Sequence, residues 1–176
     1  AAEDRVNGTF GSQNIMALVV PRGDTDSEKA VLRELGAMDE VDYAMGLANV
    51  EAKPGYCLTD KLTPRQFSQM MDLSYEEACV LYAAYTADQE DNYGPIVGGI
   101  DSYTVSAMDM ILFIYQEKEN GYVTLDDDDE EQVDDAYHQI TDAKAQMLGP
   151  NYTRMVLNLN LPEEGEETFA FLKKAH

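Results

Sequence analysis

The residues with the clearest capacity for chemistry are the consecutive carboxylates of residues 126–131, DDDDEE. Carboxylate oxygens bind Ca²⁺, but an EF-hand loop needs alternating ligands, a glycine at its sixth position and a glutamate at its twelfth. Counted from Asp126, these positions hold Glu131 and Tyr137. We therefore interpret the run as the solvated start of a helix, where the helix dipole favours negative charge, and we expect no tight metal site.

Other side chains with catalytic potential are sparse. His138 is interior and His176 is terminal, and no serine or cysteine elbow accompanies them, so no nucleophilic triad is predicted. Cys57 and Cys79 lack the spacings of zinc ligands. They would form a disulfide if they meet in an oxidising compartment, or remain two separate, largely buried thiols. Glycine-rich nucleotide motifs are missing from the sequence. We therefore expect no enzyme activity and no cofactor.

The charge of the chain narrows the class of partner. Its 34 acidic and 12 basic residues give a net charge of −22, which repels phosphate backbones, so nucleic acid is not an expected partner. The longest apolar runs, residues 15–20 and 110–115, are far shorter than the ~20 residues of a membrane span. Residues 1–12 do not resemble a signal peptide. The chain as given is therefore expected to be soluble, which is compatible with its being part of a larger membrane protein.

Three segments are predicted to be strands that form one sheet. Residues 152–161 alternate apolar and mostly polar side chains until Pro162, which indicates a half-buried strand followed by a helix over residues 163–175. Residues 14–20, NIMALVV, are nearly all apolar and predict a buried strand. Residues 41–48 alternate again, with Val41, Tyr43, Met45 and Leu47 expected on one face. A helix lies between these two strands: we expect Thr25 to cap it with Glu28, and Gly36 to end it in a left-handed conformation.

The middle of the chain has a helical texture. Thr63-Pro64 and Ser74-Tyr75 are start signals for two helices, Ser106 begins a third, and residues 124–126 begin a fourth. Residues 60–148 are therefore predicted to form a helical subdomain with its own core. Its most buried members are expected to be Leu81, Tyr85, Ile111, Leu112, Val133, Ile140 and Met147. Tyrosines concentrate in this part (Tyr82, Tyr85, Tyr93, Tyr103 and Tyr115). They either line a pliable apolar groove together with methionines or place their hydroxyls at the rim of a small core.

The order of elements predicts an α+β fold, an incomplete ferredoxin-like split βαβ layer of three strands and two helices with a large helical insertion. The crossover rule places residues 152–161 between residues 14–20 and 41–48, antiparallel to both. Residues 1–55 and 149–176 form the layer, and residues 56–148 the insert. The edge formed by Ile15 to Val20 is left open, which favours self-association.

Several stretches resemble the extracytoplasmic domain of MMPL-type exporters of the resistance–nodulation–division (RND) superfamily. FGSQN at residues 10–14 runs into IMALVVPRGD, and NYTR at residues 151–154 is followed by LPEEGEETF. LTPRQFSQMMDLSYEEACVLY and YTVSAMDMILFIY resemble the helical insert of such proteins. The similarity spans nearly the whole chain, although no single motif is a catalytic signature.

The resemblance implies a location and a role. It implies a porter-like domain on the extracytoplasmic side of the cell membrane, attached to the transmembrane helices and second extracytoplasmic domain of a parent transporter. Transport would be driven by the proton gradient through membrane residues outside this chain. The domain would face or gate the export of lipids, drugs or other hydrophobic molecules. The alternative is a free-standing acidic binding module, secreted or attached to the surface. Apolar spans of ~20 residues flanking this segment in the reading frame would establish the exporter.

Overall fold

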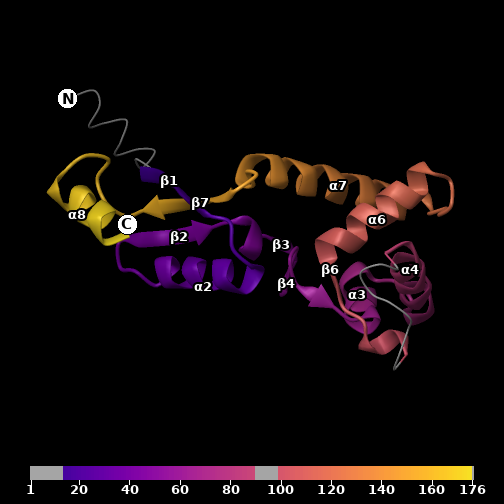
Figure 1. Ribbon diagram of the computed structural model, residues 1–176. Coiled ribbons are helices and arrows are strands. Elements are labelled where there is room, and N and C mark those ends of the chain that lie inside the picture. Colours follow the sequence, from indigo (N-terminus) through magenta and orange to yellow (C-terminus); the bar gives the residue numbers. More distant parts are fainter. Residues whose placement is uncertain (1–13, 90–98, 176) are drawn as a thin grey trace. The chain divides into compact units, whose positions relative to one another are not determined.

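The computed structural model describes residues 14–89 and 99–175 and has a mixed α+β architecture (Figure 1). The chain divides into two compact units. One contains residues 1–49 and 146–176, and the other contains residues 50–145. The sequence places these boundaries at 55/56 and 148/149. Each unit has a separate cluster of buried apolar residues, so each is described by itself.

The first unit is built on a sheet of three antiparallel strands, β1 (Asn14–Pro21), β2 (Val41–Met45) and β7 (Tyr152–Leu159). The strand order is β1-β7-β2, which confirms the order and directions predicted from the sequence. Ala17 of β1 lies opposite Val156, and Ala44 of β2 lies opposite Leu157. The central strand ends at Leu159 rather than at residue 161, and beyond it the backbone N–H of Asn160 donates to the carbonyl of Glu40 at 3.1 Å.

Helices α2 (Thr25–Gly36) and α8 (Glu166–Ala175) contribute to one core with the sheet. Leu32 and Leu35 of α2, Phe171 of α8, and Leu157 of β7 are all buried in it. The two helices therefore cover the same face of the sheet, because their buried residues belong to one cluster with the inward residues of β7.

The ends of α2 differ from the expectation. Asp24, not Thr25, caps the helix: its Oδ1 accepts a hydrogen bond from the backbone N–H of Ser27 at 2.9 Å. Gly36 is the last helical residue. The helix closes at Ala37 in a right-handed conformation, and the Ala37 N–H donates to the carbonyl of Arg33. An aspartate is as good a cap as a threonine, so the start signal was one residue earlier than predicted.

Two strand predictions are also corrected. Strand β2 ends at Met45 and is followed by a short 3₁₀ turn, η1 (Leu47–Asn49). A register shift between Val41 and Tyr43 inserts an extra residue, so Val41 is buried while Tyr43 and Met45 are exposed. Strand β1 is not buried on both faces. Its residues alternate, and Ile15 and Val19 are 57% and 63% exposed, because no described helix covers that face.

The second unit contains the four helices that the sequence predicts and two small pairs of strands that it does not. The helices are α3 (Pro64–Met71), α4 (Tyr75–Asp88), α6 (Ala107–Glu119) and α7 (Asp127–Met147), of which the last two residues belong to the first unit. Strand β3 (Glu51–Lys53) pairs with β4 (Tyr56–Cys57), and β5 (Lys61–Leu62) pairs with β6 (Val105–Ser106). A 3₁₀ turn, η2 (Ile100–Ser102), precedes β6.

Local signals explain how α3 and α4 are joined. Both begin with a capping box, Thr63 with Gln66 and Ser74 with Glu77, as the start signals predict. Helix α3 ends at Met71, and the next residue, Asp72, adopts a left-handed conformation with φ of 59°. Aspartate tolerates this conformation. The chain can therefore reverse within a few residues and begin α4.

The core of the second unit is only partly the predicted one. Ile111, Val133 and Ile140 are buried as expected, whereas Leu81, Tyr85 and Leu112 are half-buried. Met147 is buried but lies in the first unit. The most buried stripe of α4 consists of Ala78, Tyr82 and Thr86. Helix α4 contacts both α3 and α6, and this pair of neighbours selects a different face from the one that hydrophobicity alone indicates.

Candidate functional site

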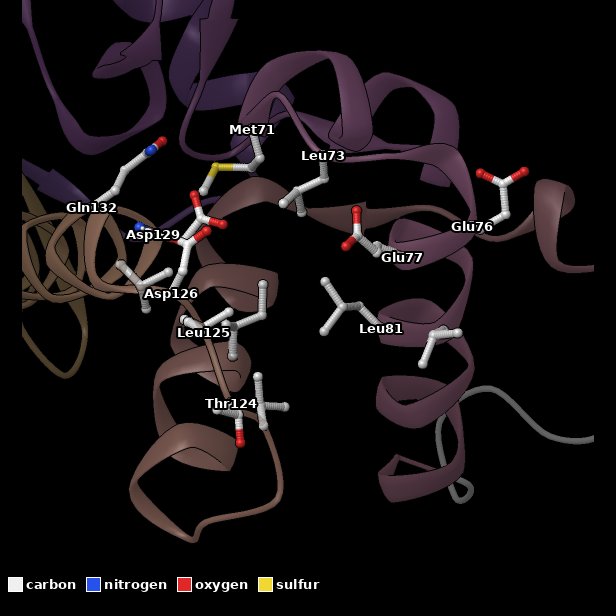
Figure 2. A pocket seen from close by; sticks show the side chains of 14 residues that line it. Met71, Leu73, Glu76, Glu77, Leu81, Thr124, Leu125, Asp126, Asp129 and Gln132 are labelled. Carbon is white, nitrogen blue, oxygen red and sulfur yellow. Dashed lines mark hydrogen bonds between the residues drawn. The ribbon is translucent and has the colours of Figure 1, made fainter.

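The second unit contains a cavity of about 470 Å³, which we call the α4–α7 cavity. Its walls come from the end of α3, from α4, from α6, and from α7 with the segment that leads into it (Figure 2). The apolar part of the lining consists of Met71, Leu73, Val80, Leu81, Ile114, Val123, Leu125 and Val133. This volume and lining are typical of sites for small molecules.

Helical spacing explains how α4 presents the cavity wall. Glu76, Glu77, Val80 and Leu81 lie at spacings of three and four, and therefore share one face of α4. This face lies beside the stripe that is buried in the core. Val80 is 69% exposed, an unfavourable position for a branched apolar side chain in water. A bound apolar molecule would cover part of this surface.

Acidic side chains surround the apolar lining. Glu77 of α4 extends into the space from one wall, Asp126 and Asp129 extend from the opposite wall, and Glu76 points away from it (Figure 2). The Oδ1 atom of Asp126 accepts a hydrogen bond from the N–H of Asp129 at 3.0 Å. The hydroxyl and backbone N–H of Ser74 hold the pKa of the Glu77 carboxyl below its usual range. The Glu77 carboxylate therefore stays ionised at neutral pH.

A second hollow, of about 270 Å³, adjoins the first. Met71 and Gln132 line both, so their side chains lie between the two spaces. The Oε1 atom of Gln132 accepts a hydrogen bond from Lys53 Nζ at 3.0 Å, which orients the amide. Met71 is unbranched and adaptable, so this boundary can change shape.

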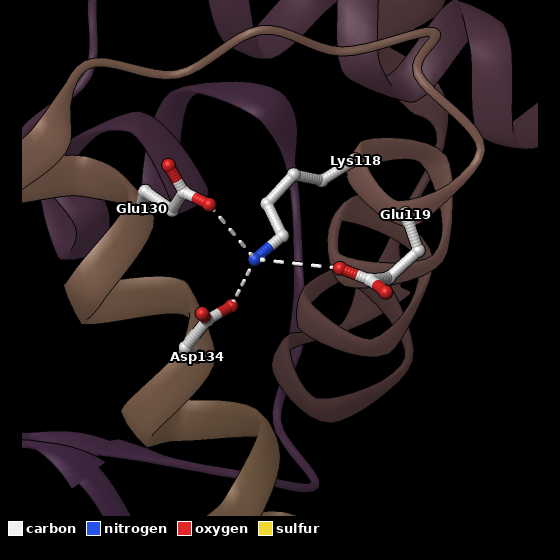
Figure 3. A network of polar contacts seen from close by, with 4 residues as sticks. All are labelled: Lys118, Glu119, Glu130 and Asp134. Carbon is white, nitrogen blue, oxygen red and sulfur yellow. Dashed lines mark hydrogen bonds and ion pairs between the residues drawn. The ribbon is translucent and has the colours of Figure 1, made fainter.

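A polar network holds α6 against α7 and so fixes one wall of the cavity (Figure 3). Lys118 Nζ lies 3.4 Å from Glu130 Oε1 and 3.7 Å from Glu119 Oε1, and it also pairs with Asp134. The hydrogen bond to Asp134 is the main reason why the pKa of Lys118 is raised. The Lys118 ammonium therefore forms ion pairs with three carboxylates.

Aromatic rings extend the same contact between α6 and α7. The ring of Tyr115 stacks on that of Tyr137, with centroids 3.6 Å apart and an angle of 8° between planes. Lys118 Nζ lies 5.1 Å from the centroid of the Tyr115 ring. Burial is the main cause that raises the pKa of Tyr115. The stack and the ion pairs are therefore structural and position the start of α7.

The carboxylate run begins α7, as predicted. Residues 127–130 form its first turn, and Asp126 and Asp129 are the members that reach the cavity. Across residues 14–89 and 99–175, no group of three or more His, Cys, Asp or Glu side chains is arranged to hold a metal ion. His138 is exposed on α7 and contacts the ring of Tyr137. Cys57 and Cys79 are not joined in the disulfide that the sequence left open.

None of the tyrosines that the structure describes lines the α4–α7 cavity. Tyr82 is fully buried and donates its hydroxyl to the Leu62 carbonyl at 2.6 Å. Tyr85 packs edge-on against Phe113. Tyr93 lies outside the described residues. Sequence reasoning missed the cavity because its walls come from four separate segments. The detectable signal was local, two glutamates followed by Val80 and Leu81 on one helical face.

Comparison with known proteins finds no match to this chain among protein-family models, curated proteins or solved structures. None of the helices in the described part of the chain has the length and apolar character required to span a membrane.

Proposed function

We propose that this chain is an extracytoplasmic domain of a proton-driven exporter of the RND/MMPL type, and that the α4–α7 cavity receives a hydrophobic molecule during export. The observation that carries the binding role is the apolar cavity of about 470 Å³, a size that suits a drug-like molecule or part of a lipid. A domain outside the membrane that faces or gates the substrate needs a binding site of this kind. It does not need a catalytic group.

The arrangement of the first unit supports the family assignment. The strand order β1-β7-β2, the two helices on one face and the insertion between β2 and β7 are the features of a split βαβ layer that has gained a domain. In this proposal the layer is a ferredoxin-like, porter-type scaffold on the extracytoplasmic side of the cell membrane. Residues of the parent transporter outside this chain relay the protons.

A free-standing acidic binding module, secreted or attached to the surface, is the second candidate. The same cavity favours it, because a hydrophobic ligand would bind there in either context. The reading frame that encodes the chain separates the two candidates. Apolar segments of ~20 residues before residue 1 and beyond residue 176 are expected for the exporter. If the flanking segments hold no such spans, the exporter proposal is wrong and the module remains.

The binding role is tested with a neutral naphthylamine dye whose fluorescence rises in apolar surroundings. We expect saturable binding to the whole chain. The substitution Val80→Trp places a large ring at the mouth of the cavity, and because Val80 is 69% exposed it leaves the core intact. The matched control is Val31→Trp, at a 39% exposed valine of α2 in the other unit. Loss of binding in the Val80 variant alone supports the proposal, and equal binding in both variants contradicts it.

A further inference from the structure

We propose that the α4–α7 cavity selects cationic amphiphiles, molecules with an apolar body and an ammonium or guanidinium head, over neutral and anionic ones. This inference rests on the proposed hydrophobic binding role and adds the charge of the ligand. It is carried by the placement of carboxylates on opposite walls of an apolar cavity, where Glu77 faces Asp126 and Asp129 (Figure 2).

The charges of the lining are all of one sign. The fourteen residues that line the cavity include four carboxylates and no lysine, arginine or histidine. An anionic head would be repelled from each wall, whereas a cationic head between the walls would be attracted by both. A chain with a net charge of −22 adds to this preference through its overall field.

Neighbouring cations do not neutralise these carboxylates. Lys118, on the adjoining helix α6, is engaged by Glu119, Glu130 and Asp134. Lys53 donates to the amide of Gln132. The acidic charge at the cavity is therefore uncompensated by these two lysines.

The apolar lining decides between an amphiphile and a bare cation. A metal ion needs converging oxygen ligands, and across residues 14–89 and 99–175 no group of three or more acidic, histidine or cysteine side chains is placed to supply them. A hydrophobic body can contact Leu81, Ile114 and Val133 while its head reaches the carboxylates. The ligand class that satisfies both parts of the site is an amphiphile with a positive head.

The test compares three compounds that share an octyl chain: octyltrimethylammonium, octyl glucoside and octyl sulfate. Each is added below its micelle concentration to the whole chain, and displacement of the neutral dye is measured. Exposed ion pairs are each weak, so we expect the cation to bind about tenfold more tightly than the sulfate, with the glucoside between them. The difference should shrink as salt is added, because salt screens exposed charges.

The charge variant is Glu77→Gln combined with Asp129→Asn. Glutamine at position 77 retains the capping box of α4. The matched control is Asp127→Asn combined with Asp128→Asn. It also removes two negative charges, both from the first turn of α7 at positions that do not line the cavity. We expect the charge variant to lose the preference for the cation over the sulfate, while the control keeps this preference.

Each outcome has one meaning. If the dye and all three octyl compounds fail to bind, the hydrophobic binding role itself is wrong. If the glucoside binds but the cation is not preferred over the sulfate, only the charge selectivity is wrong. The selectivity is equally contradicted if the control loses the preference as fully as the charge variant, because the effect would then come from net charge rather than from the cavity.

Discussion

Separate cores predict separate stabilities for the two units, and one pair of substitutions tests this. Phe67 is 0% exposed in the core of the second unit, and its ring packs edge-on against that of Tyr82, with centroids 6.0 Å apart. Leu157 is 0% exposed in the core of the first unit. We expect Phe67→Ala to destabilise residues 50–145 and Leu157→Ala to destabilise the sheet and its helices, each without affecting the other unit.

The magnitude follows from burial. Replacing a fully buried phenylalanine by alanine costs about 3–5 kcal/mol, and replacing a fully buried leucine costs about 2–5 kcal/mol, because both leave a cavity. A loss of about 3 kcal/mol in the free energy of unfolding speeds amide hydrogen exchange through unfolding by about a hundredfold. The effect should appear in α3, α4 and α6 for the first variant, and in β7 and α2 for the second.

Hydrogen exchange followed by mass spectrometry resolves these segments in the intact chain. The control substitution is Ile15→Ala, at a side chain that is 57% exposed, where we expect a change within about 0.5 kcal/mol. If Leu157→Ala speeds exchange in α3 and α4 as much as in β7, the two units unfold together. The inference of two independent cores would then be refuted.

Three further predictions concern single contacts. Tyr82→Phe removes the donation to the Leu62 carbonyl, and it should lower the free energy of unfolding of the helical unit by about 1–3 kcal/mol in urea titrations; an unchanged midpoint would show that this bond contributes nothing. The hydrogen bond to Asp134 raises the pKa of Lys118 in the folded chain above its ordinary value of 10.5. The charged Lys118 therefore stabilises the fold fully below pH 10.5, and this stabilisation is lost as the pH rises through the raised pKa. Thermal unfolding of Lys118→Met should therefore lack the alkaline fall in stability that the unaltered chain shows, and parallel pH curves would argue against this coupling. The edge formed by Ile15 to Val20 should mediate self-association, which sedimentation should show to be abolished by Val19→Lys; association that persists in this variant would exclude the edge.

The sequence by itself determined the order and type of most elements, because the signals for them are local. Alternation along residues 152–159 depends only on the two-residue period of a strand. The capping boxes at Thr63 and Ser74 are satisfied within one turn. The antiparallel order β1-β7-β2 also followed from the chain, since the handedness of crossover connections leaves few alternatives.

Only the tertiary structure decided which faces are buried. The register shift after Val41 exposes Tyr43 and Met45, and a bulge is set by pairing with β7 rather than by the residues of β2 alone. Tyr82 is more buried than Leu81, although leucine is the more apolar residue. Helix α4 contacts two neighbours, and its orientation is fixed by packing against both.

The candidate site shows the same division. The acidic start of α7 was evident from residues 126–131, and so was its failure to match a calcium loop. That Asp126 and Asp129 lie across an apolar cavity from Glu77 was not evident. These residues are about fifty positions apart in the chain, and no local pattern relates them. The start of α7 is positioned by its contacts with α6 through Lys118, and this positioning is a property of the packed helices.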